Sequence, residues 1–209
     1  MSNLKQGDFI ELEYTGYFKG TDIAFDSSIS KDQKTVVLCL GSNSLLKGLE
    51  EKLIDKETKE ECTIELSSEE AFGKKDPRLI KIMQSKVFIK KNVNPIPGLQ
   101  VNIDGAIATI RSISGGRCVV DFNHPLAGRS LTYKVKILRV VKDLKEKVDG
   151  VINLDFPFFK NYKLENDILI ISLERLDKKL GDLVSKRFNE VIPELKTINF
   201  EELKKEKKE

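Results

Sequence analysis

The chain has 209 residues, with 36 Lys and Arg against 33 Asp and Glu, and a net charge of +3 at pH 7. Nearly balanced charges, with no basic stripe interleaved with aromatics, argue against a nucleic acid partner, and no apolar run approaches the roughly 18 residues of a membrane span. Three widely spaced cysteines and one histidine argue against a metal site and a disulfide framework, so the composition predicts a soluble cytoplasmic protein with more than one structural part.

The N-terminal part of the sequence predicts several strands. Residues 9–17 alternate with the period of two that is typical of a half-buried strand, and residues 19–22 supply turn residues after it. Residues 35–40 and 61–66 predict two further strands.

Residues 41–51 predict a tight loop and a short helix. Ser44 is the expected N-cap, Gly48 indicates the close approach of another backbone or of a ligand, and residues 50–52 are expected on the solvent side. One face of the helix is apolar, with Leu45, Leu46, Leu49 and Leu53. Simple packing of this face on a sheet is the alternative to a binding site.

Residues 74–126 differ in character from their surroundings and predict an insertion. Two strands, 106–113 and 117–122, are joined by a tight turn at Gly115 and Gly116. A long alternating strand at 130–138 is expected to pair with the strands that precede Lys74.

The C-terminal part predicts a third unit. Residues 143–150 are expected to form a linker, residues 151–159 a strand, 165–167 a turn and 168–173 a second strand. A helix with Asp177 as N-cap follows and stops at Pro193, and residues 204–209 form a solvated end. Its apolar stripe is Leu176, Leu180, Leu183, Val184, Phe188, Val191 and Ile192.

The sequence contains no paired catalytic groups and no phosphate-binding glycine loop, so covalent catalysis is not expected. His124 precedes Pro125 in a turn, where a hydrogen bond from the ring to nearby backbone is the expected role.

Four short motifs taken together resemble the FKBP family of peptidyl-prolyl isomerases. They are Leu-Glu-Tyr-Thr-Gly at 12–16, Phe-Asp-Ser-Ser at 25–28, Gly-Leu-Glu-Glu at 48–51 and Glu-Ala-Phe-Gly at 70–73. The insertion, which opens with Asp76-Pro77 and closes with residues 123–128, is similar to the insert-in-flap chaperone domain of SlyD-type members. The part from about residue 144 is similar in its placement to archaeal long-chain FKBPs.

The resemblance implies an α+β fold. An FKBP-like antiparallel half-barrel sheet wraps a short helix and comprises residues 1–73 and 127–143, with a mostly β insert-in-flap domain at 74–126. A small α+β domain at 144–209 completes the chain.

The resemblance also implies a prolyl pocket that needs no cofactor and no metal. Its implied catalytic residues are Tyr14, Phe25, Asp26, Leu46, Phe72 and Tyr133. The implied substrate-binding residues of the pocket are Val36, Leu45 and Leu49, and those of the insert are Leu79, Ile80, Ile82, Met83, Val87, Phe88 and Ile96. For the insert residues, the domain's own small core is an equally strong interpretation.

Three departures from the family pattern stand out. Phe72 occupies a position where relatives usually have tyrosine, which implies the loss of a hydrogen-bond donor to the peptide. Asp55 and Lys59 occupy positions where glycines are usual, in the turn after the helix.

The resemblance predicts a cytoplasmic peptidyl-prolyl cis-trans isomerase and folding chaperone. Its partners would be unfolded or partly folded proteins and proline-containing peptides. Two alternatives are a holdase with a vestigial pocket and an assembly module that forms a homodimer through the C-terminal helix stripe.

Overall fold

The computed structural model describes residues 3–29, 35–59, 61–173 and 177–202. The chain divides into two compact units, one made of residues 1–66 and 132–209 and the other of residues 67–131. Both units combine sheets with a few helices, which confirms the predicted α+β class. The finer division into three domains stays a prediction.

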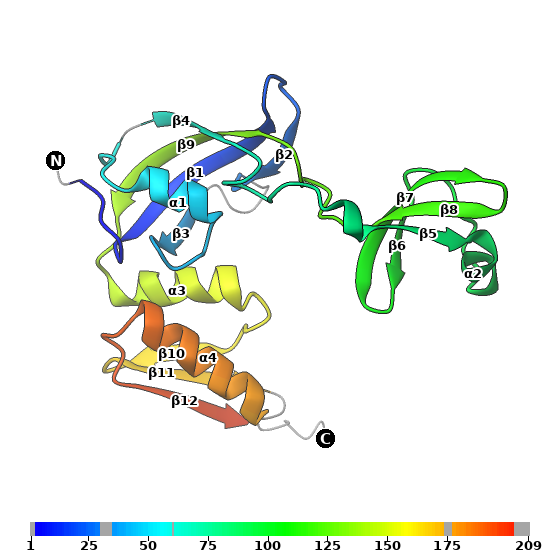
Figure 1. The fold of residues 1–209 in the computed structure, drawn as a ribbon. Helices are drawn as coiled ribbons and strands as arrows, with labels where there is room; N and C mark the ends of the chain where they lie inside the picture. Colours follow the sequence, from blue (N-terminus) through cyan, green and yellow to red (C-terminus); the bar gives the residue numbers. More distant parts are fainter. Residues whose placement is uncertain (1–2, 30–34, 60, 174–176, 203–209) are drawn as a thin grey trace. The chain divides into compact units, whose positions relative to one another are not determined.

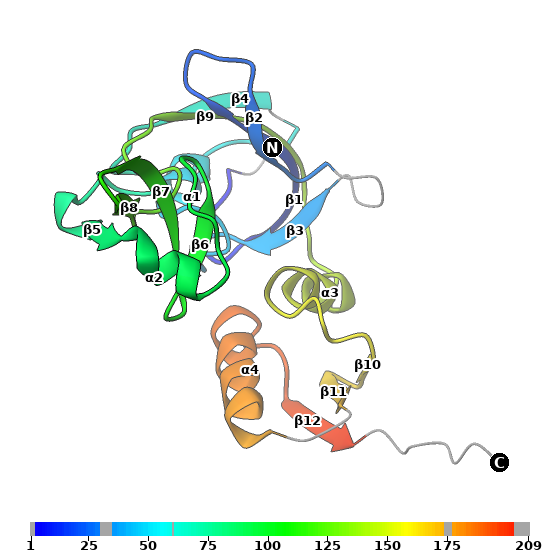
Figure 2. The same cartoon turned by 90° about the vertical axis from the view of Figure 1, so that its right-hand side faces the viewer.

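The first unit is built on a five-stranded sheet with the order β2-β1-β9-β4, in which β3 also pairs with β1. Its strands are β1 (Phe9–Phe18), β2 (Ala24–Ser27), β3 (Val36–Cys39), β4 (Glu61–Leu66) and β9 (Leu131–Val140). The predicted pairing of the strand near 130–138 with earlier strands is therefore confirmed. Figure 1 and Figure 2 show β1, β9 and β4 curving around the short helix α1 (Lys47–Leu53).

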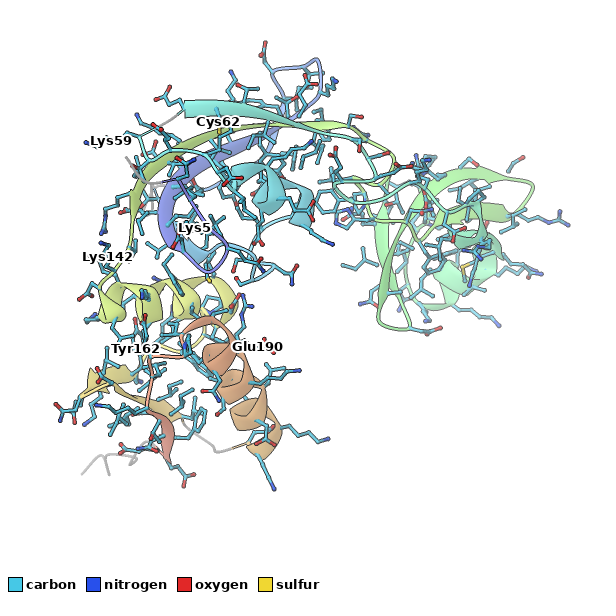
Figure 3. The ribbon with its side chains drawn as sticks, turned by 60° about the vertical axis from the view of Figure 1, so that its left-hand side comes forward. Lys5, Lys59, Cys62, Lys142, Tyr162 and Glu190 are labelled. Atoms are coloured by element: carbon cyan, nitrogen blue, oxygen red, sulfur yellow. The ribbon has the colours of Figure 1, made fainter. Side chains whose placement is uncertain are left out.

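The turn after α1 contains two non-glycine residues in the left-handed region. Asp55 has φ 66° and Lys59, labelled in Figure 3, has φ 67°. Both positions therefore favour glycine, because glycine adopts positive φ without steric cost. This chain keeps the left-handed turn with Asp and Lys.

Residues 144–155 form a helix and residues 156–159 are not a strand, so the predicted linker at 143–150 and the predicted strand at 151–159 are both wrong. Helix α3 spans Leu144–Asp155, and the Asp143 side chain caps it by accepting a hydrogen bond from Glu146 N. Val148, Val151 and Ile152 are buried along one side. Charged residues on the other side and a central glycine obscured this helical spacing in the sequence.

The C-terminal part is a small sheet with one helix. Strand β11 (Ile168–Leu173) pairs antiparallel with β10 (Tyr162–Glu165) and parallel with β12 (Thr197–Glu202), and α4 (Lys178–Val191) connects the parallel pair. The predicted turn is confirmed, since Asn166 and Asp167 both have positive φ. Asp177 caps α4 as predicted.

The apolar stripe of α4 packs inside the chain. Val184, Phe188, Val191 and Ile192 belong to one buried cluster that also contains Phe9 and residues of α3, β3 and β11. Leu183 is the exception at 59% exposed, and Leu176 lies outside the described residues. The stripe is therefore largely used by the chain's own core.

Helix α3 lies between β3 and the small sheet (Figure 1). A Cβ on Gly150 would lie 2.7 Å from the Val37 carbonyl oxygen, so only glycine permits this close approach. On the other side, the hydroxyl of Tyr162, labelled in Figure 3, donates a hydrogen bond to Asp149 Oδ1 at 2.9 Å. Apolar packing and polar contacts such as this one thus hold α3 on both sides.

The second unit contains a four-stranded sheet with the order β5-β8-β7-β6. Its elements are η1 (Pro77–Leu79), β5 (Ile80–Gln84), α2 (Ser85–Lys90), β6 (Gln100–Ile103), β7 (Ala106–Ser114) and β8 (Arg117–Asp121). The predicted hairpin turn is confirmed, because Gly115 and Gly116 join β7 and β8 and both have positive φ.

A buried carboxylate joins the two ends of the insertion. Asp121 Oδ2 accepts hydrogen bonds from Arg111 at 2.6 and 2.9 Å, and Oδ1 accepts two from Asn123 at 2.7 and 2.9 Å. Asn123 in turn exchanges two hydrogen bonds with the Asp76 backbone. Burial alone would raise the pKa of Asp121, but the hydrogen bonds from Asn123 and Arg111 outweigh it and hold the pKa at about 2.

Gly150→Ala should destabilise the first unit by about 1 to 3 kcal/mol, because the added methyl group forces α3 away from β3. Gly181→Ala is the matched control, since a Cβ there would meet Phe200 at an ordinary 3.6 Å. This control should be neutral or stabilising by up to about 1 kcal/mol. Urea unfolding followed by circular dichroism measures both, and equal stabilities would contradict the close contact.

Asp121→Asn should destabilise the unit of residues 67–131 by about 2 kcal/mol at pH 7, because the amide cannot accept all four hydrogen bonds. The carboxyl pKa is lowered in the folded protein from 3.8 to about 2. Its stabilisation is therefore complete above about pH 4 and is lost as the pH falls toward 2.

Urea unfolding followed by the NMR signals of this unit, at pH 7 and at pH 2.5, would test the expectation. Asp104→Asn is the control, because Asp104 is exposed and lies 3.9 Å from its partner Lys91. A wild-type advantage over Asp121→Asn that is the same at both pH values would refute the assignment.

Candidate functional site

Aromatic side chains from three strands meet on one face of the larger sheet. The ring centroids of Tyr14 on β1 and Tyr133 on β9 are 6.0 Å apart, and Phe25 on β2 meets Tyr133 edge-on at 5.8 Å. Phe18 packs against Phe25 at 5.3 Å. Tilted and edge-on pairs are the arrangements that aromatic rings prefer. The structure thus brings together three of the predicted site residues.

Gly16 permits this aromatic cluster, and the sequence-based site prediction missed it. A Cβ on Gly16 would lie 2.8 Å from Phe25 Cζ and 2.9 Å from Tyr133 Cε1, so any side chain would displace both rings. A glycine within an alternating strand was the available signal, since it often marks a bulge or a close approach.

A β-bulge in β2 directs the side chains of Phe25 and Asp26 toward the aromatic cluster. Gly16 pairs with Asp26 and Tyr17 pairs with Ala24, so Phe25 is the extra residue on β2. Bulges re-aim side chains in this way. Asp26 lies opposite Gly16, on the face of β1 that also carries Tyr14.

The hydroxyl of Tyr14 donates a hydrogen bond to the Asp26 carboxylate. Burial raises the pKa of Tyr14 to about 12, and the charge and hydrogen bond of Asp26 add to the rise. Burial also raises the pKa of Tyr133 above its usual value, with smaller contributions from Asp26 and Tyr14. Both phenols are therefore protonated at neutral pH and act as neutral hydrogen-bonding groups.

The predicted N-cap of α1 is wrong. The helix begins at Lys47, its N-cap residue is Leu46, and no side chain caps it. The Ser44 hydroxyl lies 2.7 Å from that of Ser42 and accepts a hydrogen bond from Arg187 Nη2 at 3.0 Å. Ser44 therefore holds the loop before the helix and not the first turn of the helix.

Glu50 fixes this loop from within, and its predicted position on the solvent side is wrong. The residue is 3% exposed. Its carboxylate accepts hydrogen bonds from Gly41 N at 3.0 Å, Asn43 N at 3.2 Å and Leu45 N at 2.8 Å. These donors precede the first turn and would otherwise be left without partners in a partly buried loop.

The backbone N–H of Leu46 has no acceptor among the residues that the structure describes. It lies directly after the Leu45 N–H that Glu50 binds, at the start of α1. Leu45 and Leu46 are half-buried, whereas Leu49 is buried in the core. Gly48 is also buried, and the close approach expected there stays a prediction.

Val36 and Phe72 have partners other than the aromatic cluster. Val36 is buried on β3, where it pairs with Leu12. Phe72 belongs to the unit of residues 67–131 and stacks on His124, with centroids 4.3 Å apart and an interplanar angle of 2°. The sequence-based site prediction missed this stack. The predicted backbone contact of His124 is confirmed, since its Nδ1 accepts a hydrogen bond from Leu126 N at 3.2 Å.

The apolar residues predicted to bind clients lie on different sides of the insert. Ile80 and Ile82 share one face of β5 and are exposed, with Ile82 at 71%. Met83, on the opposite face, packs against the insert core. Phe88 is only 4% exposed and belongs to that core. The remaining predicted residues, Leu79, Val87 and Ile96, are exposed.

A cavity of about 330 Å³ lies between α2 and β6 in the same unit. Its apolar lining comes from Val87, Phe88, Val93, Leu99, Val101 and Ile103. The sequence-based site prediction named only the first two of these residues. The insert therefore has both an exposed apolar sheet face and an apolar cavity.

Within the described ranges, no group of three or more His, Cys, Asp or Glu side chains could hold a metal ion. Cys39, Cys62 and Cys118 are free thiols. The described helices include none that is both long and apolar enough to cross a membrane.

Two family sequence profiles match the chain. The profile described as FKBP-type peptidyl-prolyl cis-trans isomerase matches residues 1–91, and the profile described as FKBP26, IF domain matches residues 81–126.

Individual relatives give the same picture. The chain is 26% identical over 144 residues to the short-type peptidyl-prolyl cis-trans isomerase of Methanocaldococcus jannaschii, which covers 64% of this chain and 92% of that protein. It is 28% identical over 142 residues to the FKBP-type peptidyl-prolyl cis-trans isomerase SlyD of Helicobacter pylori, covering 66% of this chain and 74% of that protein. It is 31% identical over 117 residues to the FKBP-type 16 kDa peptidyl-prolyl cis-trans isomerase of Escherichia coli K12, covering 54% of this chain and 78% of that protein. With the profile match, this last similarity shows that the chain belongs to the FKBP-type peptidyl-prolyl cis-trans isomerase family.

Proposed function

We propose that this isomerase is also a folding chaperone, which binds unfolded or partly folded proteins through its insert and rotates their X-Pro bonds in the aromatic pocket. One observation carries the proposal. Residues 81–126, which are similar to the IF domain of FKBP26, include Ile82. With Ile80, which comes just before this range, Ile82 forms an exposed apolar face. Solvent-exposed apolar surface of this kind often marks an interaction site.

Rotation about an X-Pro bond faces a barrier of about 18 to 20 kcal/mol, because twisting destroys amide resonance. The twisted amide is less polar than the planar amide, so a dry aromatic site favours it. Tyr14, Phe25 and Tyr133 would supply that environment for the prolyl ring. Stabilising the twisted state more than the planar state is sufficient for catalysis, and no nucleophile is required.

Three polar groups would orient the substrate. The Leu46 N–H would donate a hydrogen bond to the substrate carbonyl, since the described residues offer it no other acceptor. The Asp26 carboxylate holds the Tyr14 hydroxyl. Phe72 lacks the hydroxyl group of tyrosine and so offers no hydrogen-bond donor.

The insert would hold clients by apolar contact. Ile80, Ile82 and Ile96 are exposed and offer side chains to any unfolded segment, which suits a binder of low selectivity. Holding a client there raises the effective concentration of its prolines at the pocket, as in any two-site binder. The same apolar contacts would account for holdase activity if the pocket were vestigial.

We also propose a cytoplasmic location and the association of two copies. The free thiols are in keeping with a cytoplasmic protein. Association of two copies through the C-terminal part stays a prediction, and within the described stripe of α4 only Leu183 is exposed.

The test compares two substrates of the full-length protein. One is a proline-containing tetrapeptide, and the other is a reduced, carboxymethylated protein whose refolding is limited by proline isomerisation. Acceleration of both is expected, with a much higher kcat/KM for the protein. Suppressed aggregation of unfolded protein without acceleration of either substrate would favour the holdase.

Tyr14→Phe should lower kcat/KM for the tetrapeptide roughly three- to tenfold, because the hydroxyl bound to Asp26 is lost. Tyr17→Phe is the matched control on the same strand, where the ring instead lies under the Lys134 ammonium group at 5.2 Å. The control should keep wild-type activity. If the two variants are equally active, the Tyr14 hydroxyl has no role in the pocket.

A double variant, Ile82→Ser with Ile96→Ser, should lower kcat/KM for the refolding protein at least about tenfold and leave the tetrapeptide unaffected. Both side chains are exposed, so the fold should tolerate the change. Ile23→Ser, at an equally exposed isoleucine outside the insert (63%), is the control and should change neither rate. An unchanged kcat/KM for the refolding protein would show that these residues do not bind clients.

A further inference from the structure

The loop before α1 is held from outside by an arginine of the C-terminal helix. Arg187 on α4 donates a hydrogen bond from Nη1 to the Ser42 carbonyl at 2.7 Å and from Nη2 to Ser44 Oγ at 3.0 Å. The Ser42 hydroxyl donates in turn to the Cys39 carbonyl at 2.7 Å. The contact joins residues 145 positions apart in the chain.

This loop has a conformation that needs support. Gly41 has φ 81° and Asn43 has φ 58°, so two of its residues lie in the left-handed region, which non-glycine residues rarely adopt. Glu50 ties the backbone of the loop to α1, and Arg187 ties it to α4. Between these two charged groups, the loop leads into Leu45 and Leu46.

Other contacts hold Arg187 in place beside the loop. Its Nε donates to Asp155 Oδ2 at 2.6 Å, and its neighbour Phe188 is fully buried in the core. The planar guanidinium can bind Asp155 on one edge and two loop oxygens on the other, which a lysine cannot do. The side chain is 20% exposed, so its hydrogen bonds are partly shielded from water.

We propose that Arg187 is a positioning residue of the isomerase, through which the C-terminal helix α4 sets the conformation of residues 42–46 and so the direction of the Leu46 N–H. The inference rests on the proposed binding of the substrate carbonyl by that N–H. Arg187 does not touch the substrate. It acts by keeping the loop in the conformation that the transition state requires.

The variants Arg187→Gln and Arg187→Lys test this in the full-length chain. Both lose the two-edged contact, and Lys keeps the charge. We expect kcat for a proline tetrapeptide to fall on the order of tenfold with little change in KM, because a misplaced donor weakens transition-state binding. Amide exchange measured by NMR at Leu45, whose N–H binds Glu50, should become faster.

Lys186→Gln is the matched control on the same helix. It removes one positive charge whose partner is Glu190, at 4.0 Å and one turn away. Neither kcat nor the exchange at Leu45 should change. If Arg187→Gln behaves like this control in either measurement, Arg187 does not position the site.

Ser44→Ala removes the acceptor of the same contact on the loop side. It tests the proposal even if the arginine variants unfold. It should lower kcat in the same direction, and combining it with Arg187→Gln should cost less than the sum of the two effects. Additive effects would overturn the coupling. A wild-type protein that leaves the tetrapeptide unaffected would instead refute the proposed pocket, while the exchange at Leu45 still decides whether Arg187 holds the loop.

Discussion

The proposed pocket depends on one buried carboxylate. Glu50 takes a negative charge out of water, which is costly unless hydrogen bonds compensate for it. The loop before α1 supplies three backbone N–H donors from Gly41, Asn43 and Leu45. Those donors would in turn be unsatisfied without the carboxylate, because left-handed residues interrupt any regular backbone pairing there. The Glu50 carboxylate and the loop donors therefore satisfy each other, and together they hold the backbone that leads to Leu46.

The rest of the site is made by removing steric obstacles. Gly16 leaves the space in which the rings of Phe25 and Tyr133 meet, and the bulge at Phe25 turns that ring toward it. Each aromatic pair contributes about 0.5 to 1.5 kcal/mol beyond simple burial. The product is an aromatic surface that includes one hydrogen-bonded phenol. Such a surface suits a reaction whose barrier is the loss of amide resonance.

Patterns that are local in sequence were predictable, and contacts between distant segments were not. The strand that begins at Phe9, the turns at Gly115 and Asn166, and the Asp177 cap follow from periodicity and turn chemistry. Helix α3 was mistaken for a linker, because its charged face and its central glycine hide the buried positions.

The misassigned loop residues have the same cause. Ser44 and Glu50 were given the roles that a helix by itself would give them, a cap and a solvated face. Their actual partners are the N–H groups of a left-handed loop and an arginine far along the chain. The family resemblance named the aromatic residues of the site but not Gly16, since a glycine contributes to a pocket only by the side chain it lacks. Residues 127–209 lie outside both matched profiles, so Arg187 had no family pattern to mark it.

Two kinds of interaction attach the C-terminal part to the five-stranded sheet and its loop, namely apolar packing and the hydrogen bonds of Arg187. The buried cluster that joins α3, α4 and β3 brings the two together, but apolar packing is not directional. The absence of a side chain at Gly150 allows α3 to approach β3 closely, and α4 packs in the same buried cluster as α3. The hydrogen bonds of Arg187 are directional, because its planar guanidinium can donate to Asp155 and to the two loop serines in only one arrangement. Arg187 binds Asp155 of α3 and the loop before α1 at once, so a change in the packing of α3 would alter the proposed pocket through Arg187.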